Sequence, residues 1–188
     1  MFIRSERLFL RPAWPEDWEE LLERIADEAV VKNLARVPWP YSAEDAPGFV
    51  GKAQDRTLPH FVITLPTSAE PARMIGGIGL GESDGEIELG YWLARDFWGK
   101  GYATEATRAV ISLARTLGHR TLVSGHFVDN PASGRVLRKN GFRPTGRMRN
   151  RFCLARRSEV ASVEHRLDLG EPGNCDEGNG IAPMKRVA

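Results

Sequence analysis

The pattern of apolar and polar positions predicts a mixed fold of strands and helices. Short alternating or apolar runs, bounded by Gly, Pro or Asp, predict strands at residues 4–11, 60–65, 74–80, 86–93, 121–127, 143–154 and 159–169. Apolar residues at helical spacing predict helices at residues 15–29, 42–55, 103–117 and 130–140. About seven strands and four helices indicate an α/β (α+β) domain covering residues 1–169, followed by a polar C-terminal tail, residues 170–188.

Turn residues indicate how the middle strands connect. Asp84-Gly85 is a hairpin signal, so the strands at 60–65, 74–80 and 86–93 are expected to form an antiparallel meander. Gly76, Gly77 and Gly79 are costly inside a strand and predict a bulge or a close backbone approach.

Three helix ends carry recognisable capping residues. Ser42 is a plausible cap for the short second helix. Asn130 followed by Pro131 predicts a helix start, because Asn caps the first amides and Pro suits the first helical position. Gly141 is expected to end that helix.

A glycine-bearing turn lies between the strand at 86–93 and the helix at 103–117. Gly99 and Gly101 allow close approach of a ligand to the backbone, and the first amides of the following helix have no intrahelical partners. Such a turn can hold a phosphate or pyrophosphate. It is neither a P-loop, because Lys100 precedes the second glycine, nor a dinucleotide fingerprint, because Thr104 stands at the third glycine position.

Two segments together resemble the signatures of GNAT-superfamily N-acetyltransferases. Tyr91–Leu93 with Trp98–Ala106 looks like the acyl-CoA signature, and Asn130–Ser133 with Val136–Phe142 looks like the second signature. The branch with the greatest resemblance is the one named for ribosomal-protein alanine N-acetyltransferases, and the resemblance covers roughly Arg4 to Leu169. It implies a GNAT-like, mostly antiparallel twisted sheet in which two parallel strands splay to admit the acyl-pantetheine arm.

The resemblance also implies acetyl-CoA as the acyl donor and a set of residues that hold it. A backbone N–H at Trp92 or Leu93 could polarise the thioester carbonyl, as an oxyanion donor does. The other expected donor contacts are Trp98, Gly99, Lys100, Gly101, Tyr102, Ala103, Thr104, Asn130 and Ser133.

Two residues are candidates for catalysis. Members of the family often carry a carboxylate at the position of Glu88, where it could accept the amine proton; the alternative is a plain ion pair with an arginine across the sheet. Many of these enzymes use a tyrosine seven residues after the asparagine as general acid, but this chain has Leu137 there. In the ribosomal-protein branch the serine at the position of Ser133 is thought to serve the leaving thiolate, while Asn130 could both cap the helix and contact the pantetheine arm.

Charge is unevenly distributed, although the formal net charge is only +1. Seven acidic residues lie between Glu16 and Glu28, and nine Arg or Lys without any acid lie between Asn130 and Ser158. These runs are either solvated faces or regions that attract an amine and an anionic ligand, respectively. Trp39 and Tyr41 lie in a region that borders the acceptor site in the resembling family, so they either bind the acceptor or pack in the core.

Composition argues against several other classes of protein, namely metalloproteins, disulfide-bonded proteins, membrane proteins and nucleic-acid-binding proteins. Two cysteines and four scattered histidines form no metal or disulfide pattern, and no uncharged run is long enough to span a bilayer. The first residues lack the apolar core of a signal peptide, so a cytoplasmic protein without a membrane or metal partner is expected. The basic segment lacks the interleaved aromatic residues of a nucleic-acid platform.

The leading hypothesis is an acetyl-CoA-dependent N-acetyltransferase, a monomer or homodimer, that acts on a primary amine such as a protein N-terminus. The alternatives are acetylation of a small amine, such as a polyamine or an antibiotic, and a non-catalytic acyl-CoA-binding module.

Overall fold

The computed structural model describes residues 1–51, 53, 55–67 and 72–170. The expected tail therefore lies, apart from Gly170, outside the described residues. The strands are β1 (Ile3–Arg4), β2 (Phe9–Arg11), β3 (His60–Leu65), β4 (Arg73–Ser83), β5 (Glu86–Leu93), β6 (Thr121–Phe127), β7 (Arg143–Cys153) and β8 (Ser158–Asp168). The helices are α1 (Trp18–Ile25), α2 (Glu28–Val31), α3 (Ala46–Val50), α4 (Tyr102–Thr116) and α5 (Pro131–Lys139), with single 3₁₀ turns η1 (Pro15–Asp17) and η2 (Arg95–Phe97).

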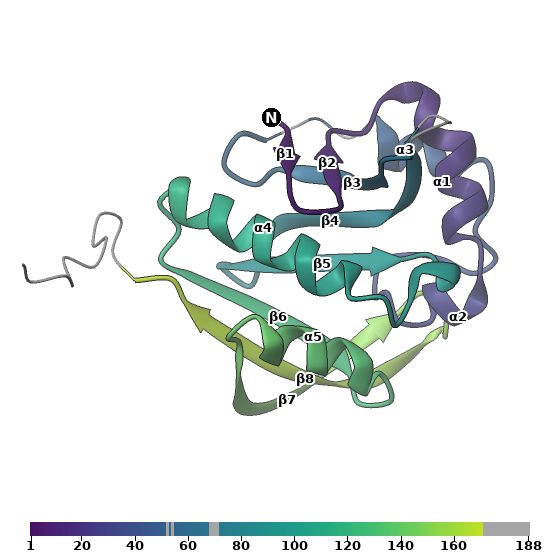
Figure 1. Ribbon diagram of the computed structural model, residues 1–188. Helices are drawn as coiled ribbons and strands as arrows, with labels where there is room; N and C mark the ends of the chain where they lie inside the picture. Colours follow the sequence, from purple (N-terminus) through teal and green to yellow (C-terminus); the bar gives the residue numbers. More distant parts are fainter. Residues whose placement is uncertain (52, 54, 68–71, 171–188) are drawn as a thin grey trace, which may run out of the picture.

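One eight-stranded sheet organises the described chain, in the order β1-β2-β3-β4-β5-β6-β8-β7 (Figure 1). All neighbouring strands pair antiparallel except β5 and β6, which are parallel. The predicted mixed, mostly antiparallel fold and the meander β3-β4-β5 are therefore confirmed, although the sheet has one strand more and the fold one helix more than expected.

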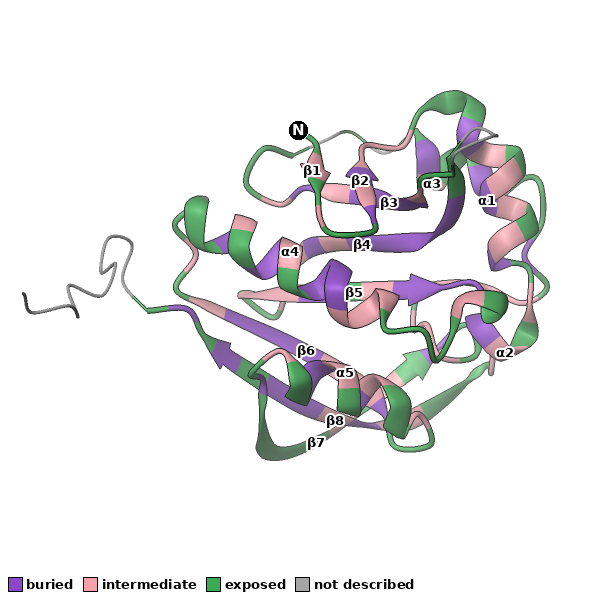
Figure 2. Ribbon diagram, viewed as in Figure 1, coloured by how far each residue is buried: buried purple, intermediate pink, exposed green. Residues whose placement is uncertain are grey.

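Two apolar clusters cover the two faces of this sheet. Figure 2 shows the buried positions along the strands β4, β6 and β8. On one face, α4 and α5 pack on alternate strand residues such as Phe61, Leu89 and Leu93. On the other face, the helices α1 to α3 pack on Val62, Met74 and Trp92. Period-two alternation along β3 and β5 thus assigns each side chain to one of the two layers.

Local signals explain why these elements begin and end where they do. Asp84 and Gly85 both have positive φ, as the predicted two-residue hairpin turn requires. Asn130 caps α5 through its side chain, and Gly141 (φ +87°) follows its end, both as predicted. The predicted close backbone approach is confirmed at Gly76, where a Cβ would lie 2.2 Å from the Trp92 carbonyl oxygen; at Gly77 the close neighbour is a side chain, since a Cβ would lie 2.7 Å from the Trp92 indole nitrogen.

Three expectations near the N-terminus were wrong in detail. The strand predicted at residues 4–11 is two short antiparallel strands, β1 and β2, because the chain reverses at residues 5–8. The helix predicted at residues 15–29 breaks after Ile25, where Asp27 caps a separate α2 by accepting a hydrogen bond from the Ala29 amide. Ser42 does not cap α3; the helix starts after Asp45, to whose carboxylate the Ser42 hydroxyl donates.

Candidate active site

The glycine turn after β5 has the geometry of an anion cradle. Gly99 and Gly101 have φ of +74° and +83°, a left-handed conformation that disfavours other residues. Gly101 is the N-cap residue of α4, so the first amides of this fifteen-residue helix open toward the turn. Trp98, Gly99 and Gly101 line a cavity of about 880 Å³, the size of a small-molecule site.

The same cavity extends past the start of α4 and α5. Of the residues expected to contact the donor, those lining the cavity are Trp92, Leu93, Trp98, Gly99, Gly101, Tyr102, Ala103, Thr104, Asn130 and Ser133. Lys100 is not among the described lining residues, and its ammonium instead lies 5.6 Å from the centre of the Phe97 ring. Arg135 and Lys139, on α5, add two positive charges to the cavity wall.

The turn is fastened to the first hairpin by one carboxylate. Glu105 accepts hydrogen bonds from the Ser5 hydroxyl (2.7 Å) and from the Arg7 amide (2.7 Å), and its carboxylate pairs with the Arg7 guanidinium. Arg7 in turn donates to the Lys100 carbonyl oxygen at 3.1 Å. Burial acts to raise the Glu105 pKa, but the hydrogen bonds from Arg7 and Ser5 outweigh it and lower the pKa. This anchor joins residues about a hundred positions apart, so no local pattern could predict it.

Strands β5 and β6 separate next to the cradle. Their ladder consists of the single parallel pair Glu88–Val123 in the described structure, and the cavity is lined by both strands beyond that pair. The edge of β5 that faces β6 therefore has no ladder partner after Glu88. Trp92 and Leu93 lie at this end of β5, and the Leu93 carbonyl oxygen accepts a hydrogen bond from the Trp98 indole at 2.8 Å.

The first turn of α5 spans the gap between these strands. The Ser133 hydroxyl lies 2.7 Å from the phenol oxygen of Tyr91 on β5, and Gly134 packs against the His126 ring on β6. The Asn130 side chain accepts from the Ser133 amide at 3.3 Å and so fixes the turn.

Tyr91 belongs to the signature segment, but the sequence predicted no role for its side chain. Burial raises its pKa to about 12, with the Ser133 hydrogen bond acting in the opposite direction. The phenol oxygen lies within hydrogen-bond distance of both the Ser133 hydroxyl (2.7 Å) and the Ser133 carbonyl oxygen (3.2 Å). When the phenol donates to the hydroxyl, the serine proton is free to point into the cavity. Leu137, at the position of the family's usual tyrosine, is fully buried in the core.

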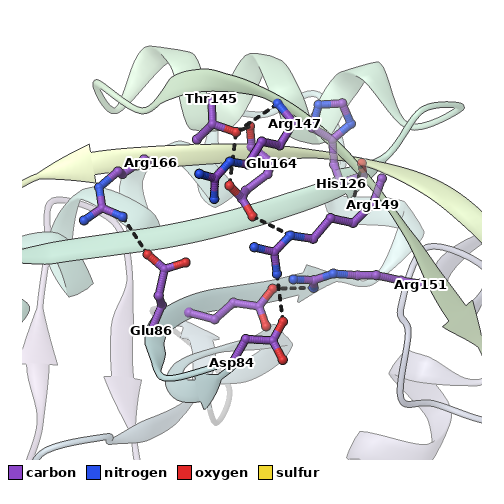
Figure 3. Close-up of polar contacts among 11 residues, drawn as sticks. Asp84, Glu86, His126, Thr145, Arg147, Arg149, Arg151, Glu164 and Arg166 are labelled. Atoms are coloured by element: carbon purple, nitrogen blue, oxygen red, sulfur yellow. Dashed lines mark hydrogen bonds and ion pairs between the residues drawn. The ribbon is translucent and has the colours of Figure 1, made fainter.

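The Glu88 side chain lies on the face of the sheet opposite the first turn of α5, and its carboxylate is ion-paired. Its carboxylate accepts a close hydrogen bond from Arg151 of β7, and both residues line the cavity. Figure 3 shows Arg151 of this pair among a set of ion pairs through which β7 and β8 reach the β4–β5 hairpin. The others join Arg149 to Asp84 and Glu164, at 2.8 and 3.0 Å, and Arg166 to Glu86 at 2.6 Å.

These ion pairs account for part of the basic run in the sequence. Arg149 and Arg151 neutralise carboxylates of the hairpin, and Arg156 pairs with Asp129 at 2.7 Å. The segment thus braces the two sides of the strand gap.

The wall opposite the sheet is formed by the loop after α2. Residues 32–37 line the cavity together with Phe49. The loop is joined to the end of β7 by two hydrogen bonds. The Leu154 amide donates to the Ala35 carbonyl oxygen (3.1 Å), and the Arg156 guanidinium donates to the Lys32 carbonyl oxygen (2.7 Å). Trp39 and Tyr41, the expected acceptor contacts, lie outside the described lining; Tyr41 is buried and Trp39 packs against the same cluster.

The described residues contain no group of His, Cys, Asp and Glu that could hold a metal ion. None of the described helices is long and apolar enough to cross a membrane.

Comparison with known proteins gives consistent matches. The profile of the acetyltransferase (GNAT) domain family matches residues 7–143. The uncharacterized N-acetyltransferase YnaD of Bacillus subtilis (strain 168) is 28% identical over 149 residues, which is 78% of this chain and 85% of that protein.

Solved structures share the fold. A GNAT-family acetyltransferase from Bacillus anthracis superposes with a TM-score of 0.76 at 24% identity, covering 90% of this chain and 99% of that one. RimL, a ribosomal alpha-N-protein acetyltransferase solved in complex with coenzyme A, superposes with a TM-score of 0.72 at 21% identity, covering 89% and 98%.

Proposed function

Because this chain belongs to the acetyltransferase (GNAT) domain family, we propose that it transfers an acetyl group from acetyl-CoA to a primary amine, in the first instance a peptide N-terminal amino group. The observation that carries the proposal is the left-handed glycine turn, which presents the first amides of α4 to a cavity running between the parted strands β5 and β6. An anionic donor and an amine can meet there from opposite faces of the sheet. RimL, which shares the fold, is a ribosomal-protein acetyltransferase, and this supports the peptide acceptor.

The donor is expected to lie along the α4 and α5 side of the cavity. Its diphosphate would accept hydrogen bonds from the amides after Gly101, where the helix dipole favours negative charge. Arg135 and Lys139 would add electrostatic attraction for the phosphates. The thioester would then lie beside the unpaired edge of β5, where the backbone N–H of Leu93 can stabilise the tetrahedral oxyanion, whereas the N–H of Trp92 faces β4.

The chemical step needs a base for the amine and a donor for the thiolate. Glu88 lies on the acceptor face and is the proposed base, taking the amine proton directly or through a water molecule while Arg151 keeps its carboxylate oriented. On the other side, Ser133 is proposed to donate its hydroxyl proton toward the departing sulfur. Tyr91 is a positioning residue, because its O–H can donate to Ser133 and so orient the serine proton.

A small amine is the second candidate acceptor. The cavity volume of about 880 Å³ also suits a compact ligand. Incubation with acetyl-CoA and a panel of peptides and small amines, followed by mass spectrometry of the acetylated products, separates the two.

A matched pair of glycine variants tests the donor site. Gly101→Val should weaken CoA at least tenfold, about 1.4 kcal/mol, because a side chain would stand where the diphosphate approaches the amides. Gly118→Val is the control: its φ of +84° matches the +83° of Gly101, so the backbone strain is equal, but Gly118 lies at the far end of α4. Equal CoA affinity of the two variants by calorimetry would reject the cradle as the donor site.

A further inference from the structure

Four glycines form a strip on the face of the sheet that carries Glu88 and Trp92. Gly77, Gly79 and Gly81 alternate along β4, and Gly79 pairs directly with Gly90 of β5. All four line the cavity. The strip is therefore a floor without side chains beside the proposed base.

Two of these glycines are explained by the fold. A Cβ on Gly77 would lie 2.7 Å from the Trp92 indole nitrogen, and a Cβ on Gly79 would lie 3.1 Å from the Pro59 carbonyl oxygen. Close packing of neighbouring atoms excludes an undisturbed Cβ at Gly77 and favours glycine at Gly79.

The other two have no such explanation. No described atom beyond the flanking residues lies within 4 Å of a Cβ built on Gly81 or Gly90, and neither has a positive φ. Glycine in a strand costs roughly 0.5–1 kcal/mol relative to alanine, so a side chain here would fit and would stabilise the strands. The empty space above Gly81 and Gly90 serves no contact within the described chain, which points to a ligand that occupies it.

The chemistry of the surrounding wall indicates what kind of ligand fits. Apolar side chains face the cavity from the opposite loop and helix, namely Leu34, Val37 and Phe49. The carboxylates among the described lining residues are Glu82, Glu88 and Asp129, and arginines already pair with the last two. On the acceptor side the lining Lys and Arg residues are Lys32, Arg36 and Arg151, and Arg151 is paired with Glu88, whereas Arg135 and Lys139 lie on the donor side. Such a wall attracts an apolar body and offers little to a second positive charge.

We propose that Gly81 and Gly90 form the floor of the acceptor site, and that the acceptor is an amine whose body next to the reacting nitrogen is apolar and carries no further positive charge. This rests on the proposed acetyl transfer and narrows its acceptor. A peptide end with an aliphatic first residue and a small aliphatic amine share this chemistry; a polyamine does not.

A matched set of acceptors and variants tests the proposal. L-leucinamide and L-lysinamide share one backbone and differ in the charge of the side chain, a hexapeptide with N-terminal leucine represents the peptide source, and spermidine represents the polyamines. The variants are Gly90→Ala, Gly90→Val and Gly81→Val. Gly48→Ala is the control, because a Cβ there also meets no described atom within 4 Å beyond its chain neighbours and its own helix α3, but Gly48 does not line the cavity.

The wild type should acetylate leucinamide or the leucine peptide with a kcat/KM at least tenfold above that for lysinamide and spermidine. Gly90→Val and Gly81→Val should raise the KM for the preferred acceptor at least tenfold, Gly90→Ala less, and CoA affinity should change less than twofold. Melting temperatures should stay level or rise, and Gly48→Ala should keep the wild-type KM. A higher kcat/KM for the leucine hexapeptide would identify a peptide end as the acceptor, and a higher kcat/KM for leucinamide would identify a small aliphatic amine.

Several results would overturn the proposal. An unchanged acceptor KM in both valine variants would mean that the floor does not touch the acceptor, and a lowered melting temperature of Gly90→Ala would mean that the fold itself uses the space. A preference for spermidine or lysinamide would refute the acceptor class while leaving acetyl transfer intact. If no amine in the panel is acetylated and CoA does not bind, the proposed function fails and this inference fails with it.

Discussion

The contact between Tyr91 and Ser133 allows a quantitative test of how the leaving thiolate is handled. Removing the phenol oxygen by Tyr91→Phe deletes its 3.2 Å hydrogen bond to the Ser133 carbonyl oxygen and its 2.7 Å hydrogen bond to the Ser133 hydroxyl, both partly buried. Such a bond contributes about 1 kcal/mol, so the loss of serine orientation should lower kcat about fivefold. Ser133→Ala removes the donor itself and should lower kcat roughly ten- to thirtyfold, or about 1.4 to 2 kcal/mol.

A double-mutant cycle distinguishes positioning from a plain structural role. If Tyr91 acts only through Ser133, then adding Tyr91→Phe to Ser133→Ala should cause no further loss of kcat, because the group that it orients is already missing. The assay follows release of free CoA with a thiol-reactive chromophore, on protein verified as folded by circular dichroism. The KM for acetyl-CoA should change less than twofold in all three variants.

Two outcomes would refute this reasoning. An unchanged kcat in Ser133→Ala would remove the serine from the reaction. Multiplicative losses in the double variant would mean that Tyr91 affects turnover without the serine, for example through packing of β5 against α4.

Two further predictions concern ionisable groups. Glu88→Gln should keep CoA affinity and lower turnover roughly a hundredfold, most strongly at low pH where the amine is protonated; equal pH–rate profiles by the same assay would leave Glu88 as a partner of Arg151 only. Burial lowers the pKa of His165, so the folded state favours the neutral ring, and stability should fall as pH drops below about 6.5, where the unfolded chain takes up the proton. Urea unfolding between pH 7.5 and 5 should show this loss, and His165→Phe should reduce it; an equal pH dependence in both proteins would contradict the assignment.

The proposed donor half of the candidate site could be predicted because it is built from contiguous chain. A strand, a glycine turn and a helix follow one another from Glu86 to Thr116, and Asn130 with Pro131 defines the next helix start within two residues. Each of these signals acts through the backbone conformation of a few consecutive residues, so it can be recognised in the sequence.

The acceptor half could not be predicted because it is assembled from distant segments. The partner of Glu88 is Arg151, and finding it requires the registers of β7 against β8 and of β8 against β6. The loop at residues 32–37 becomes a cavity wall through hydrogen bonds to Leu154 and Arg156, more than a hundred residues away. The sequence offered Trp39 and Tyr41 as acceptor contacts instead, because a sequence pattern does not distinguish an aromatic residue that packs in the core from one that contacts a ligand.

The glycines of β4 and β5 have different roles that the sequence alone does not distinguish. In the sequence, Gly77, Gly81 and Gly90 are equal: each interrupts a strand that would be more stable with a side chain. Only the structure separates Gly77, which the Trp92 indole requires, from Gly81 and Gly90, which no described neighbour requires. A residue that lowers stability without serving a contact in the fold is expected where space is needed for a ligand. The two glycines that the fold does not explain are therefore the positions where acceptor selectivity should respond most directly to an added side chain.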